Sequence, residues 1–197
     1  MKKILLMVVA ATMAMVCASA QSDFKRHEVS LGWGTLANSE WIGVLDDIAA
    51  SIAGATTKND SPTGTISAEY YYHPAAWIGV GTILGWSHTS KDIWESDAKI
   101  GKGNYSYYTV MPAVKFDWLR KNHFGMYSKL AAGATMRHAK EDFTGGASYD
   151  NFDGNMFFFN FQASLIGIEA GGHNVRAFTE LGVGEQGFLL AGVRFRF

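Results

Sequence analysis

The stretch GWSHTSKDIWESD, residues 85–97, carries the side chains best suited to covalent chemistry. His88 and Ser90 lie two positions apart, and Glu95 follows Ser90 by five residues. A serine nucleophile needs a base within hydrogen-bond reach and a third group that orients the base. These three residues therefore form one candidate hydrolytic site. The alternative interpretation is a polar strand end that runs into a solvated loop.

The elements that would position these residues are predicted to be β-strands. Eight segments alternate apolar residues with small, polar or charged ones at the two-residue period of a strand. Most of them approach the roughly ten residues that a tilted strand needs to cross a bilayer. The segments are 28–36, 65–73, 77–86, 107–118, 126–136, 157–169, 175–184 and 189–197.

The connections between these segments alternate in length. Long connections are expected near 37–64, 87–104 and 137–155, short ones near 73–76, 119–123 and 171–174, and a tight turn at 184–187. Short turns on one side of the membrane and longer loops on the other are typical of an outer-membrane barrel. Pro112 interrupts the fourth segment, and because proline cannot donate to a strand ladder, we expect a bulge or an irregular pair there.

The last segment, LLAGVRFRF, indicates which face meets protein. It places Leu189, Val193 and Phe195 on one face and Arg194 and Arg196 on the other. Arginines directed at an interior, beside an apolar outer face, are the reverse of a sheet in water. A soluble eight-stranded barrel with an apolar interior is the alternative, because alternation alone does not tell the inner face from the outer one.

Charged residues of both signs occur on the polar face of most segments. We predict that they form a paired, structural network that fills a narrow lumen, since an unpaired charge there would be costly. Closure of the barrel is expected to bring Glu28 near Arg196, and the last hairpin should bring Glu180 near Arg194. The predicted lumen network comprises Glu28, Glu69, Lys115, Asp117, Lys129, Arg176, Glu180, Arg194 and Arg196.

Residues 1–20 have the pattern of a cleaved secretory signal. Lys2 and Lys3 precede an apolar stretch over 4–16, and Ala18-Ser19-Ala20 forms a small-residue cleavage site. The apolar stretch is too short for a spanning helix. The predicted mature domain is 21–197.

The single cysteine, Cys17, falls inside this signal. A mature chain without it has no disulfide and no cysteine-based metal site. Lipidation at Cys17 is the less favoured alternative, because Val16 precedes it where lipoprotein signals have a small residue. Loss of Lys2 and Lys3 changes the formal net charge from −1 to −3, so no basic excess predicts a nucleic-acid partner.

The whole mature chain, from HEVSLGWG to GVRFRF, resembles the small eight-stranded outer-membrane barrels of the outer-membrane protein X and protein A transmembrane-domain type. The most specific part is the last strand, and YYTVMPAVKFDW also resembles a strand common in such barrels. The resemblance implies an all-β fold, an eight-stranded antiparallel transmembrane β-barrel arranged as an up-and-down meander. It also implies that Phe195 and Phe197 form the signal read by the barrel assembly machinery.

These features predict an integral protein of the bacterial outer membrane, a monomer in contact with lipid and lipopolysaccharide, with no cofactor. We expect a non-enzymatic role in envelope structure or in surface interaction through the extracellular loops. Within the first loop, Trp41 to Ala55 has helical spacing and is a candidate amphipathic helix. His27, His73, His123 and His173 belong to different strand ends and turns, so no metal site is predicted.

Two alternatives stay open. One is a lipid A-modifying hydrolase, because an outer-membrane deacylase family uses a His-x-Ser pair with a later Glu, which His88, Ser90 and Glu95 resemble. The spacing to the acid is shorter here, and Lys91 stands where that family has asparagine. The other is a narrow channel, which requires a lumen more open than this residue content favours.

Overall fold

The computed structural model describes residues 25–38, 56–95, 98–143 and 152–197. The predicted signal at 1–20 and the candidate helix at 41–55 lie outside the described residues. The strands are β1 (His27–Thr35), β2 (Thr56–Ala75), β3 (Ile78–Glu95), β4 (Ala98–Arg120), β5 (Phe124–Phe143), β6 (Phe152–Gly171), β7 (Val175–Gly184) and β8 (Leu189–Arg196).

Each strand pairs antiparallel with the next, and β8 returns to β1 to close the barrel. The closing ladder runs from Glu28 opposite Arg196 to Thr35 opposite Leu189. Closure leaves β1 without a free edge along its length, as an up-and-down barrel requires. The predicted eight-stranded antiparallel meander is confirmed. No helix among the described residues is long and apolar enough to span a bilayer.

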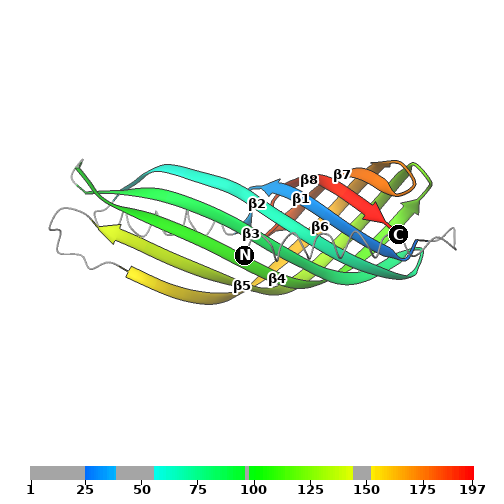
Figure 1. Cartoon of the computed structure of the whole chain (residues 1–197), viewed down its shortest axis with the longest axis horizontal. Helices are drawn as coiled ribbons and strands as arrows, with labels where there is room; N and C mark the ends of the chain where they lie inside the picture. Colours follow the sequence, from blue (N-terminus) through cyan, green and yellow to red (C-terminus); the bar gives the residue numbers. More distant parts are fainter. Residues whose placement is uncertain (1–24, 39–55, 96–97, 144–151) are drawn as a thin grey trace, which may run out of the picture.

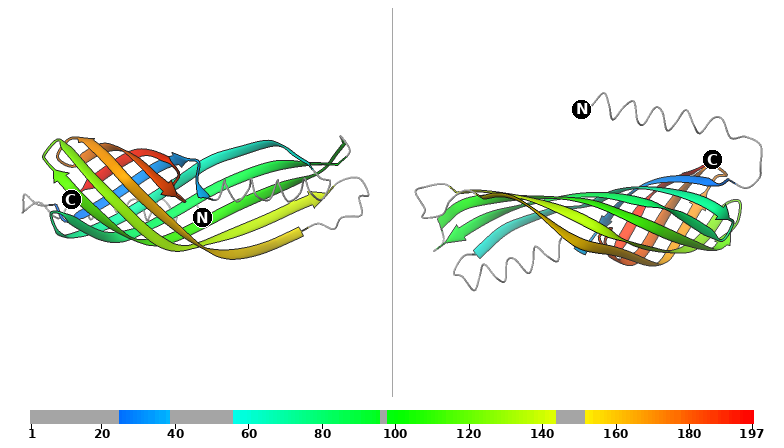
Figure 2. Two further views of the ribbon diagram at one scale, coloured as in Figure 1. Left: turned by 180° about the vertical axis from the view of Figure 1, so that it is seen from behind. Right: turned by 90° about the horizontal axis from the view of Figure 1, so that it is seen from below.

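The strands differ in length, and Figure 1 shows that the barrel is therefore uneven. β1, β7 and β8 have 9, 10 and 8 residues, whereas β2 to β6 have 18 to 23. Residues 56–64 of β2 and 152–161 of β6 lie beyond the last ladder pairs with β1 and β7. We call this extension of β2 to β6 the projecting sheet (Figures 1 and 2).

Much of the predicted long connections is therefore strand. β3 continues to Glu95 and β4 begins at Ala98, so the expected loop at 87–104 is a long hairpin. β5 likewise reaches Phe143, and β2 begins at Thr56. Neither face of these extensions has the apolar alternation that marked the rest of the strands, so periodicity did not identify them. Backbone ladder bonds continue regardless of which side chains they carry.

The other end of the barrel, which we call the turn end, holds the connections β2–β3, β4–β5 and β6–β7 together with the C-terminus (Figure 1). Pro112 pairs in register with Thr82 on β3. On the β5 side the ladder passes from Val110 opposite Ala134 to Ala113 opposite Ala131 without a shift. Of the two features expected at Pro112, the irregular pairing is present, as an interruption of the ladder with β5. The bulge is not present.

A bulge occurs in β6 instead. The register with β7 shifts between Ser164 and Ile166, so that Leu165 and Ile166 both face outward. One extra residue in a strand reverses the facing of every residue that follows. Beyond the bulge Ile168 is outward and Glu169 is fully buried.

The inside and the outside of the barrel have opposite chemistry. The largest fully buried side chains include Arg194, Lys115, Lys129 and three tyrosines. The outer face is apolar, and Phe159 and Leu165 expose 72% and 67% of their surface. Other large apolar side chains on this face include Leu31, Trp33, Leu84, Trp86, Val110, Leu130, Phe157, Leu181, Val183, Val193 and Phe195. A barrel that showed this surface to water would aggregate, whereas lipid solvates it.

Candidate functional site

Arg194 is the centre of the buried charge network. From β8 it reaches four carboxylates on four strands. Its Nε lies 2.9 Å from Glu28 and its Nη1 2.7 Å from Glu169, while Nη2 lies 3.8 Å from Glu69 and 3.7 Å from Glu180. The guanidinium also lies 4.5 Å from the ring centroids of both Tyr127 and Phe178. Cation–π contacts of this kind add to the ion pairs where water is excluded.

The strand closure places a second group around Glu28. Arg196, its partner in the closing ladder, donates from Nε to Glu28 at 2.9 Å. Lys115 of β4 reaches the same carboxylate at 2.7 Å from across the lumen. Glu28 and both cations are nearly or fully buried, so the pairing replaces the hydration that each charge loses.

A third group joins Lys129 of β5 to two acids. Its ammonium lies 2.6 Å from Glu69 of β2 and 2.7 Å from Glu180 of β7. Glu180 also accepts hydrogen bonds from Tyr127 and Ser164, both at 2.6 Å. The carboxylate is thus fully satisfied without water.

Two pairs of like charges on adjacent strands show why ion pairs to other strands are needed. Lys115 lies directly opposite Lys129 in the ladder of β4 and β5, and Arg176 lies opposite Arg194 in the ladder of β7 and β8. Like charges directly opposite one another destabilise a sheet. Glu28, Glu69 and Glu180 reach the two lysines from across the lumen, and Glu169 of the adjacent β6 pairs with both arginines. The network therefore joins strands that are not neighbours in the sheet.

Glu169 is a lumen residue that the sequence did not predict. Its carboxylate bridges three arginines, at 2.8 Å from Arg176, 2.7 Å from Arg194 and 2.5 Å from Arg196. Alternation continued from Phe161 without interruption would put Glu169 on the outer face, and the β6 bulge turns it inward. A side chain at Gly125, opposite Glu169 on β5, would meet its carboxylate at 2.6 Å. Gly125, which leaves space for this carboxylate, was a residue in the sequence that could have indicated an inward Glu169.

His73 is the second residue that was missed. It is fully buried, with Nε2 at 3.6 Å from Glu28 and Nδ1 at 3.4 Å from Asp117. It was expected among the polar turn residues, but β2 runs on to Ala75 and keeps it inside. A side chain at Gly79 would meet the imidazole at 2.8 Å. Asp117, in turn, lies 3.5 Å from Lys115 and 3.8 Å from Arg196.

The buried charges balance. Among the described residues, six acidic and six basic side chains are buried, His73 aside. All nine predicted lumen residues belong to this set, and the structure brings them into one connected cluster. The twelve are Glu28, Glu69, Asp117, Glu169, Glu180, Glu185, Lys91, Lys115, Lys129, Arg176, Arg194 and Arg196.

The candidate hydrolytic site has a different geometry from the one expected. His88 Nδ1 lies 3.1 Å from Ser106 Oγ on β4, and Ser90 donates to Asn104 at 3.1 Å. Glu95 ends β3, and the extended strand separates the Cα atoms of Ser90 and Glu95 by about 16 Å. The side chain of Glu95 lies outside what the structure describes. His88 and Ser90 do not form a pair, and the serine next to the imidazole is Ser106.

Phe195 and Phe197 lie where the barrel closes. Phe195 is 40% exposed on the outer face, opposite Val29 and Val175. Phe197 exchanges two backbone hydrogen bonds of 2.9 Å with His27, and the two rings stack at 5.4 Å. The last residue of the chain thereby completes the ladder with β1.

No family model and no curated protein matches the chain. Among solved structures, it is similar to Ail, the attachment invasion locus protein of Yersinia pestis, in complex with the heparin analogue sucrose octasulfate. That match has 14% identity, a TM-score of 0.49, and coverage of 88% of this chain and 100% of the other. A second structure of Ail matches with 16% identity, a TM-score of 0.45, and coverage of 88% and 97%. The resemblance to the outer-membrane protein X and protein A type stays a prediction.

Proposed function

We propose that this protein is an integral β-barrel of a bacterial outer membrane, with residues 1–20 as its export signal. The closed barrel with an apolar outer face and a charged, self-neutralised interior supports this proposal. The turn end would face the periplasm, and the projecting sheet would stand outside the cell.

Cysteine labelling tests this orientation, because Cys17 is the only cysteine and lies in the proposed signal. Asp153→Cys places a thiol on the projecting sheet, and Asn122→Cys places one at the turn end. A membrane-impermeant maleimide should label the first variant in intact cells, and the second only after the outer membrane is permeabilised. Labelling of Asn122→Cys in intact cells would reverse the orientation.

We infer that the role is non-enzymatic and is exerted through the outward face of the projecting sheet. The ladder aligns Trp86, Tyr108, Met136 and Phe157 in one row around four strands. The next outward row is polar, formed by His88, Ser106, His138 and Asn155, and the row after it by Ser90, Asn104, Lys140 and Asp153. An aromatic and apolar row followed by polar rows matches the boundary between hydrocarbon and headgroups.

The single observation that carries this role is the change, along the ladder, from an outward apolar row to two outward polar rows. At the headgroup level of an outer membrane, the polar rows would meet the sugars and phosphates of lipopolysaccharide. The side chains in the rows pair with one another, as in His138 with Asn155 at 2.9 Å, which holds the donors in place. A rigid, hydrogen-bonding wall on long strands suits surface contact better than catalysis.

Stability in vesicles with and without lipopolysaccharide tests this contact. Added lipopolysaccharide should raise the free energy of unfolding of the parent protein, and should raise it less in a variant with His138→Ala and Lys140→Ala. The matched control is Arg26→Ala, which removes an exposed cation at the turn end. Equal stabilisation of all three proteins would exclude a contact through the polar rows.

The hydrogen bond between His88 and Ser106 keeps a hydrolase as the second candidate. Mass spectra of lipid A from cells that express the parent protein, Ser106→Ala, Ser90→Ala and His88→Ala decide between the two. We expect identical spectra. Loss of an acyl chain with the parent protein, but not with Ser106→Ala or His88→Ala, would identify an outer-leaflet hydrolase.

A further inference from the structure

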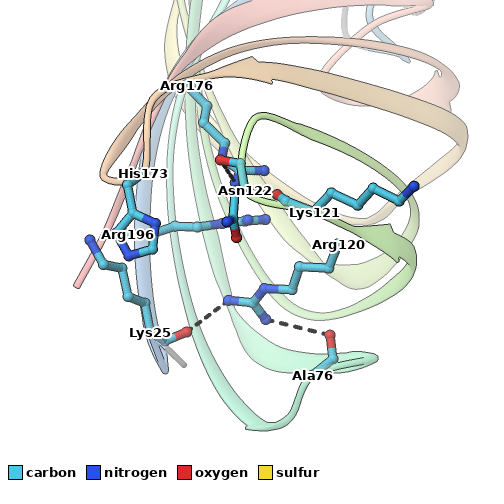
Figure 3. Close-up of a pocket in the computed structure, with 8 residues that line it drawn as sticks. All are labelled: Lys25, Ala76, Arg120, Lys121, Asn122, His173, Arg176 and Arg196. Carbon is cyan, nitrogen blue, oxygen red and sulfur yellow. Dashed lines mark hydrogen bonds between the residues drawn. The ribbon is translucent and has the colours of Figure 1, made fainter. Parts of the chain in front are cut away.

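A basic cavity of about 130 Å³ opens at the turn end of the barrel. Figure 3 shows the eight residues that line it, which come from the segment before β1, from three turns, and from the ends of β4, β7 and β8. Five of the eight are lysine or arginine, one is histidine, and none is acidic. The lining comprises Lys25, Ala76, Arg120, Lys121, Asn122, His173, Arg176 and Arg196.

Backbone carbonyls hold the guanidinium groups of this cavity in place. Arg120 donates from Nη2 to the carbonyl of Lys25 at 2.7 Å. Arg176 donates from Nη2 to the carbonyls of Lys121 and Asn122 at 2.6 and 2.7 Å. In Figure 3 Arg196, His173 and Lys25 lie beside one another, whereas Lys121 extends away from them. The cations are therefore positioned before any ligand arrives, which lowers the entropy lost on binding.

The cavity holds more cations than the lumen acids beside it neutralise. Arg176 and Arg196 pair with Glu169, Arg196 also pairs with Glu28, and Asp117 is 3.9 Å from Arg120. Lys25 and Lys121 have no acidic partner among the described residues, so the surplus charge is theirs. Lys25 donates a hydrogen bond only to a neutral amide, that of Asn174, among the contacts the structure describes for it. Burial, followed by the charges of Arg176 and Arg196, lowers the pKa of the Lys25 ammonium. An anion in the cavity would relieve this repulsion.

We propose that the turn-end cavity binds a phosphate group. Planar guanidinium forks and an ammonium are the donors that proteins use for phosphate oxygens, and a histidine edge adds one more. The cavity is large enough for one phosphate with attendant water, and too small for a bulky ligand.

Two sources could supply the phosphate. A soluble phosphate or phosphomonoester could enter from the periplasmic side. Alternatively, a phospholipid of the inner leaflet could place its headgroup there. His27 stacks on Phe197 and lies near Tyr70 and Tyr72 at this rim, which sets the cavity at headgroup depth.

The test is a titration of the ¹⁵N-labelled barrel with inorganic phosphate in octyl glucoside micelles, which contain no phosphate. Saturable shifts are expected at the amides of the turns near Asn122, Gly172 and His173, with no effect of sodium chloride at equal ionic strength. Loss of one charge-assisted contact in Arg120→Gln should weaken the affinity about tenfold. Lys25→Gln, outside the strands, should weaken it in the same direction.

Lys102→Gln is the matched control, because it removes an exposed cation at the opposite end of the barrel, outside the polar rows. A gel that separates folded from unfolded barrel verifies each variant. Shifts that do not saturate, or affinities of Arg120→Gln and Lys25→Gln that equal that of Lys102→Gln, would overturn the proposal. Such results would mean that phosphate only screens surface charge.

Mixed micelles distinguish the two sources. In octyl glucoside micelles with added phosphatidylglycerol, the same turn amides should shift without inorganic phosphate if a lipid headgroup occupies the cavity. If only added inorganic phosphate shifts them, the source is soluble. Both outcomes require the cavity to bind phosphate, and absence of both effects would exclude it.

Discussion

Individual charges in this protein are stabilised by partners across the lumen. Arg194 contacts carboxylates from β1, β2, β6 and β7, and Glu169 contacts three arginines. These two central members therefore have several partners each, which distributes the cost of burial. Replacing a charge with an apolar side chain of similar size leaves the lumen with a net charge, and that imbalance is expensive.

Arg194→Met should lower the free energy of unfolding by about 3–5 kcal/mol, because the five carboxylates of the connected cluster then face four of its cations. Urea unfolding in phospholipid vesicles, followed by tryptophan fluorescence, measures the change. Lys140→Met is the control and should change stability by less than about 1 kcal/mol, since Lys140 is half exposed. Equal losses in the two variants would show that the network contributes little.

Residue type and parity predicted most of the lumen but not all of it. Glu28, Lys115 and Arg196 lie in stretches of strand where inward and outward residues alternate without interruption. Their inward facing could therefore be predicted from the two-residue period. Glu169 follows a bulge, and the only residue in LIGIE that indicates one is Gly167, since glycine inside a strand often marks a bulge. His73 follows Glu69 and Tyr71 at the two-residue period, so spacing did indicate its inward facing, although it was interpreted as a turn residue. The facing of Glu169 could not be predicted from spacing, because it depends on ladder register.

At the scale of elements, bulges and glycines adjust the strands to the crowded interior. The β6 bulge turns Glu169 inward and leaves Leu165 and Ile166 adjacent on the outer face. Tyr127 of β5 fills the space beside Gly167 of β6, where a side chain would meet its ring at 2.4 Å. Both devices fit large polar side chains into a narrow lumen.

The bulge makes a prediction that plain alternation does not. Leu165→Arg and Ile166→Arg should each destabilise the barrel in vesicles, by about 1–4 kcal/mol depending on depth, since both side chains are exposed on the outer face that the proposed function places in lipid. If inward and outward residues simply alternated, only one of the two side chains would face outward, and only one substitution would be expected to have this effect. Equilibrium unfolding of both variants checks this, and a neutral effect at either position would contradict the bulge.

Gly167→Ala should cost about 1–3 kcal/mol, because the added methyl group displaces the Tyr127 ring and its hydrogen bond to Glu180. The matched control is Gly172→Ala in the β6–β7 turn, where the nearest atom would lie 3.6 Å away. Thermal shifts of the folded band on a gel compare the two. Similar midpoints for both variants would mean that Tyr127 moves freely.

The strand ends were the elements that sequence predicted least well. The membrane-facing parts of the strands have a strong apolar alternation, and their pairing follows from it. The hairpin of β3 and β4 continues through Lys91, Lys102 and Gly103, where neither face is consistently apolar. Its ladder depends on backbone hydrogen bonds and register, which leave no two-residue pattern in the sequence.

At the scale of the whole molecule, the filled lumen bears on transport. Arg194, Tyr71, Tyr127, Lys115 and Lys129 are fully buried within the barrel and occupy its cross-section. An eight-stranded barrel is just wide enough for side chains to fill. The narrow-channel alternative would need several of these ion pairs to separate at once.

Planar-bilayer recordings of the purified barrel should therefore show no large, stable, ohmic openings. A useful comparison is a variant with Lys129→Ala and Tyr127→Ala, which removes volume from the lumen while the strands stay intact. Its conductance should exceed that of the parent protein. Frequent openings in the parent protein itself would mean that the network does not close the lumen.

The unequal strands also give the molecule a direction within the plane of the membrane. β2 to β6 form a tall wall on one side, and β7, β8 and β1 form a low rim on the other. A neighbouring molecule that approaches from the wall side meets the outer polar rows, whereas one from the rim side meets none of them. Rotation about the membrane normal therefore decides which neighbours can associate, and two barrels would be inequivalent partners unless they turned the same side toward each other.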